Sequence, residues 1–319
     1  MRKNPYIIGT FLLLGISLLS GYLLAYEDNL PDNKDHFKNI TTKNSATSNV
    51  PLILPVPDQL EFAGENVPLD KPDIRERLEK ELYITAHRYY QVVFYLKRAP
   101  RILPKLAEEL NEAGIPEDFK YMAVIESDLL PTIESPVGAK GIWQFMPATA
   151  RRYGMEVNRY VDERMHLDKA TRAAIAYLKK SYSKLDSWTL SAASYNMGLA
   201  RTKRIVEQQQ TTDYYNLYMN SETSRFVFRI LAAKLIIDNP GVYGYSLPEH
   251  EAYKPISYRE ISVERGISNL VEWSKSQGFS YYMLKKLNPW ILRKKLPAGS
   301  YKVRIPKSGK LNNNIDLSL

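Results

Sequence analysis

The sequence predicts a mainly α-helical protein with an apolar helix at its N-terminus and a small α+β module at its C-terminus. Three observations support this prediction. Residues 5–25 carry no charged side chain. Apolar residues recur at helical spacing from about residue 72 to residue 245, and they alternate at strand spacing in two short stretches beyond residue 245. We therefore divide the 319 residues into four parts, 1–25, 26–70, 71–245 and 246–319.

Composition excludes several kinds of site. The chain has no cysteine, which excludes a disulfide framework, thiolate chemistry and thiolate zinc sites. Its four histidines lie far apart, none belongs to an HExxH motif, and the sequence has no glycine-rich phosphate loop. We therefore expect no metal ion and no cofactor.

The chain is basic, with 44 Lys and Arg side chains against 35 Asp and Glu and a net charge of +9. Residues 246–319 hold 13 Lys and Arg side chains and 6 Asp and Glu side chains, so most of the excess positive charge belongs to the C-terminal module. Such a surface favours an anionic partner, for example nucleic acid, a membrane surface or an acidic polymer. Nucleic-acid binding rests on charge alone, and we do not expect it.

Residues 5–25 are long enough to cross a bilayer, which takes about 20 apolar residues. Arg2 and Lys3 precede them and favour a cytoplasmic N-terminus, which places the rest of the chain on the periplasmic face of the cell envelope. We expect a membrane anchor, because no A-x-A cleavage motif follows; a cleaved export signal is the alternative. Residues 26–70 are rich in Asn, Asp, Ser and Pro and are predicted to form a polar linker.

Helix-start and helix-stop residues give the elements of residues 71–245 in order. Pro116 is a favourable first-turn residue, Asp168 is a capping residue, and Pro240 follows the last helix. The predicted helices cover residues 73–98, 99–111, 116–127, 147–153, 169–185, 188–196, 199–209 and 222–238. In residues 246–319, short strands are expected around residues 261–263 and 303–305, with short helices at residues 268–276 and 281–287.

Glu126 is the first candidate for chemistry. It shares a helical face with Phe119, Met122 and Ala123, at spacings of seven, four and three residues. Desolvation on an apolar face raises the pKa of a carboxyl group, which would leave Glu126 protonated near neutral pH and able to act as a general acid. A solvated glutamate at a helix end is the alternative interpretation.

Two further segments carry polar groups suited to sugar binding. In residues 135–154, Gln144 stands between Trp143 and Phe145; aromatic faces cover the apolar side of a pyranose, and an amide both donates and accepts hydrogen bonds. A turn with core aromatics is the alternative for this segment. Further on, Tyr195 and Asn196 end an alanine-rich helix, where local capping explains Asn196 equally well.

These motifs together resemble a known enzyme family. Glu126-Ser127, then SPVGAKGIWQFMPATA at residues 135–150, then ASYNMG at residues 193–198, in this order and spacing, resemble the lytic murein transglycosylases with a goose-type lysozyme-like domain, nearest to the membrane-bound D type. The resemblance covers about residues 85–240 and implies a lysozyme-like fold for residues 71–245. It makes Glu126 the sole catalytic acid/base and gives substrate contacts to Ser127, Ser135, Gln144, Met146, Tyr195 and Asn196.

The activity that this resemblance implies is cleavage of peptidoglycan glycan strands. Glu126 would protonate the leaving oxygen at the MurNAc-GlcNAc β-1,4 bond and then take the proton of the C6 hydroxyl, which leaves a 1,6-anhydromuramyl end. A hydrolytic muramidase of the same fold and a non-catalytic peptidoglycan-binding protein are the alternatives. One residue departs from the family pattern: Phe226 replaces a tyrosine thought to steady the glutamate, so Tyr195 or a water must substitute for it.

Residues 261–306 resemble a degenerate LysM module, a βααβ fold that binds glycans containing N-acetylglucosamine. The usual Gly-Asp-Thr turn is replaced by Gly266, Ile267 and Ser268. The resemblance implies glycan binding by this module. A small packing domain whose Lys and Arg side chains keep it soluble is the alternative.

Overall fold

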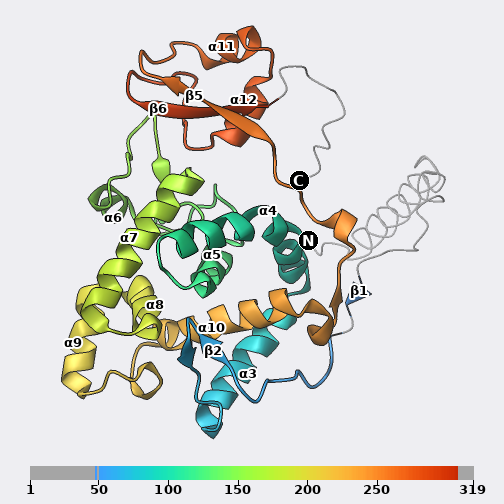
Figure 1. The fold of residues 1–319 in the computed structure, drawn as a ribbon, viewed down its shortest axis with the longest axis vertical. Coiled ribbons are helices and arrows are strands. Elements are labelled where there is room, and N and C mark those ends of the chain that lie inside the picture. The colour runs from blue at the N-terminus through green and yellow to red at the C-terminus, as the bar shows by residue number, and fades with distance from the viewer. Residues whose placement is uncertain (1–46, 49, 308–319) are drawn as a thin grey trace, which may run out of the picture. The chain divides into compact units, whose positions relative to one another are not determined.

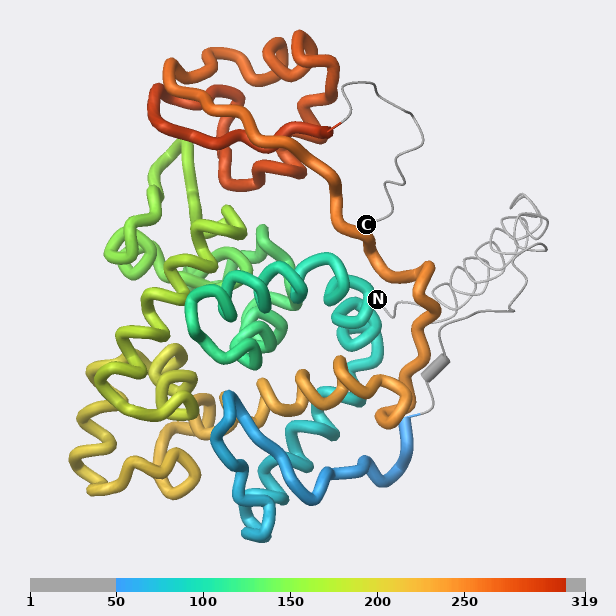
Figure 2. Tube along the Cα trace, viewed as in Figure 1, coloured from blue at the N-terminus to red at the C-terminus, as the bar shows by residue number. Residues whose placement is uncertain are grey.

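The computed structural model describes residues 47–48 and 50–307 (Figures 1 and 2). The predicted membrane anchor at residues 5–25 lies outside these residues. Within the described ranges, no helix combines the length and the apolar character that crossing a bilayer requires. The described part is mainly helical and ends in a small module with two strands, as the sequence predicts.

Helices make up most of residues 72–238. They are α3 (Pro72–Ala86), α4 (Tyr89–Glu112), α5 (Lys120–Ser127), α6 (Pro147–Arg152), α7 (Leu167–Leu185), α8 (Trp188–Met197), α9 (Leu199–Gln209) and α10 (Ser221–Asp238). Single 3₁₀ turns lie at Glu117–Phe119, Glu163–Met165, Tyr214–Asn216, Pro240–Tyr243 and Glu249–Glu251.

Short strands flank this helical domain. β2 (Glu61–Phe62) and β3 (Glu65–Asn66) form a hairpin, and β1 (Thr47–Ser48) pairs antiparallel with β4 (Tyr245–Ser246). The C-terminal module consists of β5 (Tyr258–Val263), α11 (Leu270–Ser276), α12 (Tyr281–Leu287) and β6 (Tyr301–Pro306). β5 and β6 pair antiparallel, with Tyr258 opposite Pro306 and Val263 opposite Tyr301.

The predicted break between residues 98 and 99 is wrong. The chain turns at His87 and Arg88 instead, and α4 then runs without a break through Pro100 and Pro104. Both prolines are exposed, whereas Ile102, on the opposite face, is buried. A proline on the solvent side of a helix is tolerated because water can satisfy the carbonyl group that loses its partner.

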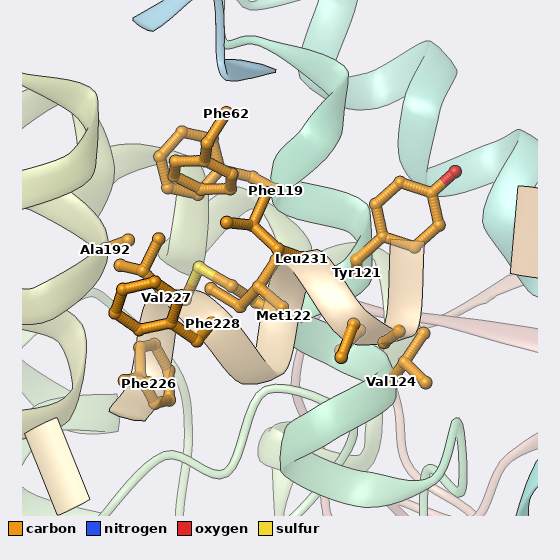
Figure 3. Packing of buried hydrophobic residues seen from close by; sticks show 14 of the residues in the cluster. Phe62, Phe119, Tyr121, Met122, Val124, Ala192, Phe226, Val227, Phe228 and Leu231 are labelled. Carbon is orange, nitrogen blue, oxygen red and sulfur yellow. The ribbon is translucent and has the colours of Figure 1, made fainter. Parts of the chain in front are cut away.

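The core of the helical domain forms around α5 and α10. α5 lies against α4 and α10, and α10 also packs on α3 and α8 (Figure 1). Figure 3 shows Met122 of α5 among Val227, Phe228 and Leu231 of α10, all fully buried. A buried, packed α5 holds its C-terminal turn, and therefore Glu126, in a fixed position.

Part of the predicted linker belongs to this core. Residues 26–70 are predicted to be a linker, yet Phe62 is fully buried and packs edge-on against Phe119 with ring centroids 5.3 Å apart (Figure 3). The Glu65 carboxylate accepts the backbone N–H of Thr189 at 2.9 Å in the first turn of α8, where a negative charge is favourable. The polar composition of residues 26–70 predicts a linker because a short hairpin needs few apolar residues to hold it. Here Phe62 and Glu65 supply the contacts with the core.

Candidate active site

Glu126 lies in the last turn of α5, and the chain leaves this helix through a tightly held corner. Asp128 adopts a left-handed conformation with φ of 52°. Its carboxylate accepts hydrogen bonds from Gln91 at 2.8 Å and from the Tyr95 hydroxyl at 2.9 Å, and Arg98 donates to its carbonyl oxygen at 2.9 Å. These contacts with α4 fix the backbone directly after Glu126.

The Glu126 carboxyl group is partly buried and carries a strongly shifted pKa. Burial raises its pKa from 4.5 to about 7; the positive charge of Arg229 lowers the pKa, and the negative charge of Glu222 raises it. The Arg229 guanidinium donates to the Ile125 backbone carbonyl at 3.2 Å, and the nearby Arg225 pairs with Glu81. Glu126 can therefore carry a proton near neutral pH, as a general acid must.

This pKa predicts a pH-dependent stability difference between the wild type and Glu126→Gln. Between pH 4.5 and pH 7 the unfolded chain loses the Glu126 proton while the folded chain keeps it, so rising pH destabilises the wild type across this window. The free energy of unfolding of Glu126→Gln should gain roughly 3 kcal/mol on that of the wild type over this range and stay level above it. Urea unfolding at a series of pH values measures the difference.

Comparing two proteins isolates Glu126 from other groups that titrate in the same range. Burial also raises the pKa of Glu109 to about 7 and lowers the pKa of His166 to about 3, but both groups are present in each protein. Parallel stability curves for the two proteins would show that the Glu126 carboxyl group titrates as it does in water.

The segment with Gln144 forms a closed loop, here called the glutamine loop, residues 135–145. Within it, the Lys140 N–H donates to the Phe145 carbonyl at 3.1 Å. Gln144 has a φ of 49°, and its side-chain amide donates to the Gly141 carbonyl at 2.9 Å. The amide N–H groups of Gln144 thus hold the loop together, and its carbonyl oxygen is the atom left to accept a hydrogen bond from a ligand.

The two aromatic neighbours of Gln144 belong to the core. Trp143 is fully buried and donates to the Thr171 hydroxyl at 3.0 Å, and Phe145 is buried as well. The prediction that these rings cover a sugar is therefore wrong, and the alternative of a turn with core aromatics holds for them. The left-handed backbone at Gln144 separates its side chain from the two buried rings.

Tyr195 and Asn196 end α8 beside the same site. The Tyr195 hydroxyl donates to the Trp143 carbonyl at 2.7 Å, and burial together with the negative charge of Glu126 raises the pKa of Tyr195. The single hydrogen of this hydroxyl is committed to the glutamine loop, so Tyr195 does not also donate to the Glu126 carboxylate. Phe226, for which the resemblance implies a tyrosine in the family, is buried in the core.

Asn196 is tied to the first turn of α10. Its amide nitrogen donates to the Glu222 carboxylate at 3.1 Å, and its amide oxygen accepts the Thr223 hydroxyl at 2.6 Å. The side chain therefore fixes Glu222, and it links the end of α8 to the carboxylate whose charge acts on Glu126.

The three remaining predicted contact residues have different environments in the structure. Ser127 is buried and its hydroxyl donates to the Ala123 carbonyl at 2.8 Å, and its contact with substrate stays a prediction. The Ser135 hydroxyl accepts the Ala139 N–H at 3.0 Å and closes the glutamine loop. Met146 is exposed and remains a candidate contact.

Glu222 and Arg229 also act on Glu126, a role that the sequence motifs did not predict. Seven residues separate them, which places both on one face of α10, so their opposite charges act on Glu126 from the same side. The sequence does contain a signal for this pair, because Glu222 and Arg229 carry opposite charges and are spaced by two helical turns. Within the described ranges, no group of three or more His, Cys, Asp or Glu side chains is arranged to hold a metal ion.

Two families match this chain. Residues 106–218, which contain Glu126, Gln144, Tyr195 and Asn196, match the family described as Transglycosylase SLT domain. Residues 259–309 match the Soluble lytic transglycosylase C-terminal LysM-like domain. Both matches confirm the resemblances that the sequence motifs indicate.

A curated relative is the membrane-bound lytic murein transglycosylase D of Escherichia coli K12, 27% identical over 262 residues. The match covers 80% of this chain and 57% of that protein, so the chain spans little more than half the length of this relative. Similar solved structures are the 70 kDa soluble lytic transglycosylase of E. coli (21% identity, TM-score 0.38) and an inactive variant of the lytic transglycosylase Slt of Pseudomonas aeruginosa (20% identity, TM-score 0.33). Each match covers 47% of this chain and 26% of the other.

Proposed function

We propose that this chain is a lytic transglycosylase that cleaves the MurNAc-GlcNAc β-1,4 bond of peptidoglycan. The observation that carries the proposal is the Glu126 carboxyl group, whose pKa burial raises to about 7, within a segment that matches the Transglycosylase SLT domain. Envelope localisation and anchoring through residues 5–25 belong to the same proposal, supported by the relationship to a membrane-bound transglycosylase.

The reaction needs one group that gives a proton and later takes one back. Protonated Glu126 donates its proton to the glycosidic oxygen as the bond to C1 breaks, and the 2-acetamido group of the sugar stabilises the positive charge on C1. The Glu126 carboxylate then removes the proton of the C6 hydroxyl while its oxygen bonds to C1. The product is a 1,6-anhydromuramyl end, no water is consumed, and Glu126 is protonated again.

The neighbours of Glu126 suit both halves of this cycle. Burial favours the protonated acid before cleavage, and the positive charge of Arg229 favours the carboxylate that cleavage produces. With a pKa near 7, Glu126 can both give a proton to the glycosidic oxygen and take one from the C6 hydroxyl at neutral pH. The free carbonyl oxygen of Gln144 and the exposed Met146 are the groups proposed to meet the glycan.

Glu222 gives the hydrolytic alternative a physical basis. Glycosidases that use water place a second carboxylate near the acid, and the charge of Glu222 does act on Glu126. However, Glu222 accepts the Asn196 amide at 3.1 Å, which engages one of its oxygens. The transglycosylase reaction needs no second base, so we favour it.

Product analysis separates the two reactions. The full-length chain in detergent should release muropeptides with anhydro ends from purified sacculi, each lighter by one water than the hydrolytic product. Mass spectrometry of the soluble fraction measures both species. Products with reducing ends alone would establish the muramidase, and the absence of any product that depends on Glu126 would establish the non-catalytic binding protein.

We propose that the C-terminal module contributes glycan binding. A hollow of about 780 Å³ lies on the module between β5 and α11, lined among others by Ile261, Asn269 and Trp273. An aromatic side chain beside an amide suits a sugar ring. Loss of binding to insoluble peptidoglycan in Trp273→Ala would support this role.

A further inference from the structure

The hydrophobic core of the C-terminal module contains two side chains from the helical domain. Val161 and Met165 come from the segment between α6 and α7, here called the connecting segment, residues 156–166. Val161 is fully buried and Met165 nearly so, and both lie in one cluster with module residues. The module members of this cluster are Leu270, Phe279, Leu284, Trp290, Ile291, Leu296, Tyr301, Val303 and Ile305.

Backbone hydrogen bonds extend this contact. The Asp162 N–H donates to the Trp290 carbonyl at 2.9 Å, and the Leu292 N–H donates to the Tyr160 carbonyl at 2.8 Å. These two bonds frame an antiparallel bridge between Val161 and Ile291. The connecting segment is therefore paired with the module as a strand pairs with its neighbour, and this fixes its register.

Charged side chains close the edge of the same interface. Asp168, in the first turn of α7, pairs with Arg304 of β6 and with Lys105 of α4 at 2.6 Å. Arg304 in turn lies 3.3 Å from the Glu260 carboxylate on β5. Arg304 is largely buried, so its pairing with carboxylates from both sides specifies how the module attaches.

The connecting segment also supports the glutamine loop. Arg164 is 4% exposed, and its guanidinium donates to the Gly138 carbonyl at 2.7 Å and to the Phe145 carbonyl at 3.0 Å. These carbonyl groups lie on either side of Gln144. The other guanidinium nitrogens bind both oxygens of Asp162, at 2.8 Å and 2.7 Å, which fixes the plane of the fork.

We propose that the C-terminal module supports the active site, and that Arg164 is the positioning residue that joins the module-bound connecting segment to the glutamine loop. Asp162 links the two contacts directly, because its N–H binds the module while its carboxylate holds Arg164. The consequence for catalysis rests on the proposed glycan cleavage. The structural link between the module and the glutamine loop does not depend on glycan cleavage, so the link and the activity can be tested separately.

The test uses two valines that belong to the same cluster. Val161→Ala and Val303→Ala each remove two methyl groups from fully buried positions of the module core, but only Val161 lies on the connecting segment. Arg164→Lys keeps the charge beside Asp162 and removes the fork that reaches both carbonyl groups. Full-length proteins in detergent are compared by hydrogen exchange of the Lys140, Gly141 and Gln144 amides, whose acceptors lie in or beside the glutamine loop.

We expect these amides to exchange about tenfold faster in Val161→Ala and in Arg164→Lys, and at the wild-type rate in Val303→Ala. For glycan cleavage, kcat should fall about tenfold in the first two variants with little change in KM, because the loop is misplaced while the rest of the binding surface is intact. Unchanged exchange in Val161→Ala or Arg164→Lys, or equal acceleration in Val303→Ala, would overturn the proposal. An inactive wild type with the expected exchange pattern would overturn the glycan cleavage and leave the support in place.

Discussion

Replacing Glu126 with glutamine is expected to reduce the release of anhydro-muropeptides roughly 10³-fold, the range of a lost general acid. The amide occupies nearly the same volume as the carboxyl group, so the packing around Met122 and α10 should persist. It cannot give a proton to the glycosidic oxygen or take one from the C6 hydroxyl, so both halves of the cycle fail. Mass spectrometry of digested sacculi measures the remaining product.

Glu108→Gln provides the matched control. Glu108 lies on the exposed side of α4, so the same chemical change there should leave product release at the wild-type level. Circular dichroism at neutral pH would show that both variants are folded. If Glu126→Gln released as much product as Glu108→Gln, Glu126 would not be the acid, and the one-carboxylate mechanism would have to be abandoned.

Replacing Gly141 with alanine should disrupt the glutamine loop. An alanine Cβ at this position would lie 1.8 Å from the Arg164 carbonyl oxygen, which is a backbone atom and cannot rotate away. Gly141 also has a φ of 86°, a conformation that costs alanine about 1 to 2 kcal/mol. We expect a total loss of about 3 to 5 kcal/mol in the free energy of unfolding. Cleavage should fall about a hundredfold, because the loop must move by more than an ångström.

Gly138→Ala separates the clash from the backbone strain. Gly138 lies in the same loop with a φ of 85°, but no atom lies within 4 Å of the position of an added Cβ. It should lose only the strain energy of about 1 to 2 kcal/mol and much less activity. Denaturant unfolding and product release are measured for both variants. Equal losses in the two would mean that the close approach to Arg164 does not hold the loop.

Sequence patterns predicted the helices well because each depends on local spacing and capping. The ends of α8, α9 and α10 lie within one residue of the predicted ranges. The prediction failed where burial decided the outcome. The prolines of α4 do not break it because they face solvent, and the hairpin β2–β3 is held by contacts with residues more than 50 positions away.

The candidate site shows the same contrast between features that depend on local sequence and features that depend on burial. The sequence placed Glu126, Gln144 and Tyr195 in one site, and the structure connects them through the Trp143 carbonyl and the charge of Glu126. The sequence could not show that Trp143 and Ser127 are buried, because the order of the family motifs along the chain does not say which of their side chains pack into the core. The contribution of Glu222 depends on how α10 packs against α5, which is a tertiary property.

The shared cluster of Val161 and Met165 has a practical consequence for work on the C-terminal module. A fragment excised near residue 246 would lack both side chains and would expose the apolar surface that they now cover. Uncovered apolar surface promotes self-association, so sugar affinity measured on such a fragment would describe an altered species. Carbohydrate titrations are therefore meaningful only on the intact polypeptide, in which the connecting segment and the C-terminal module form this core together.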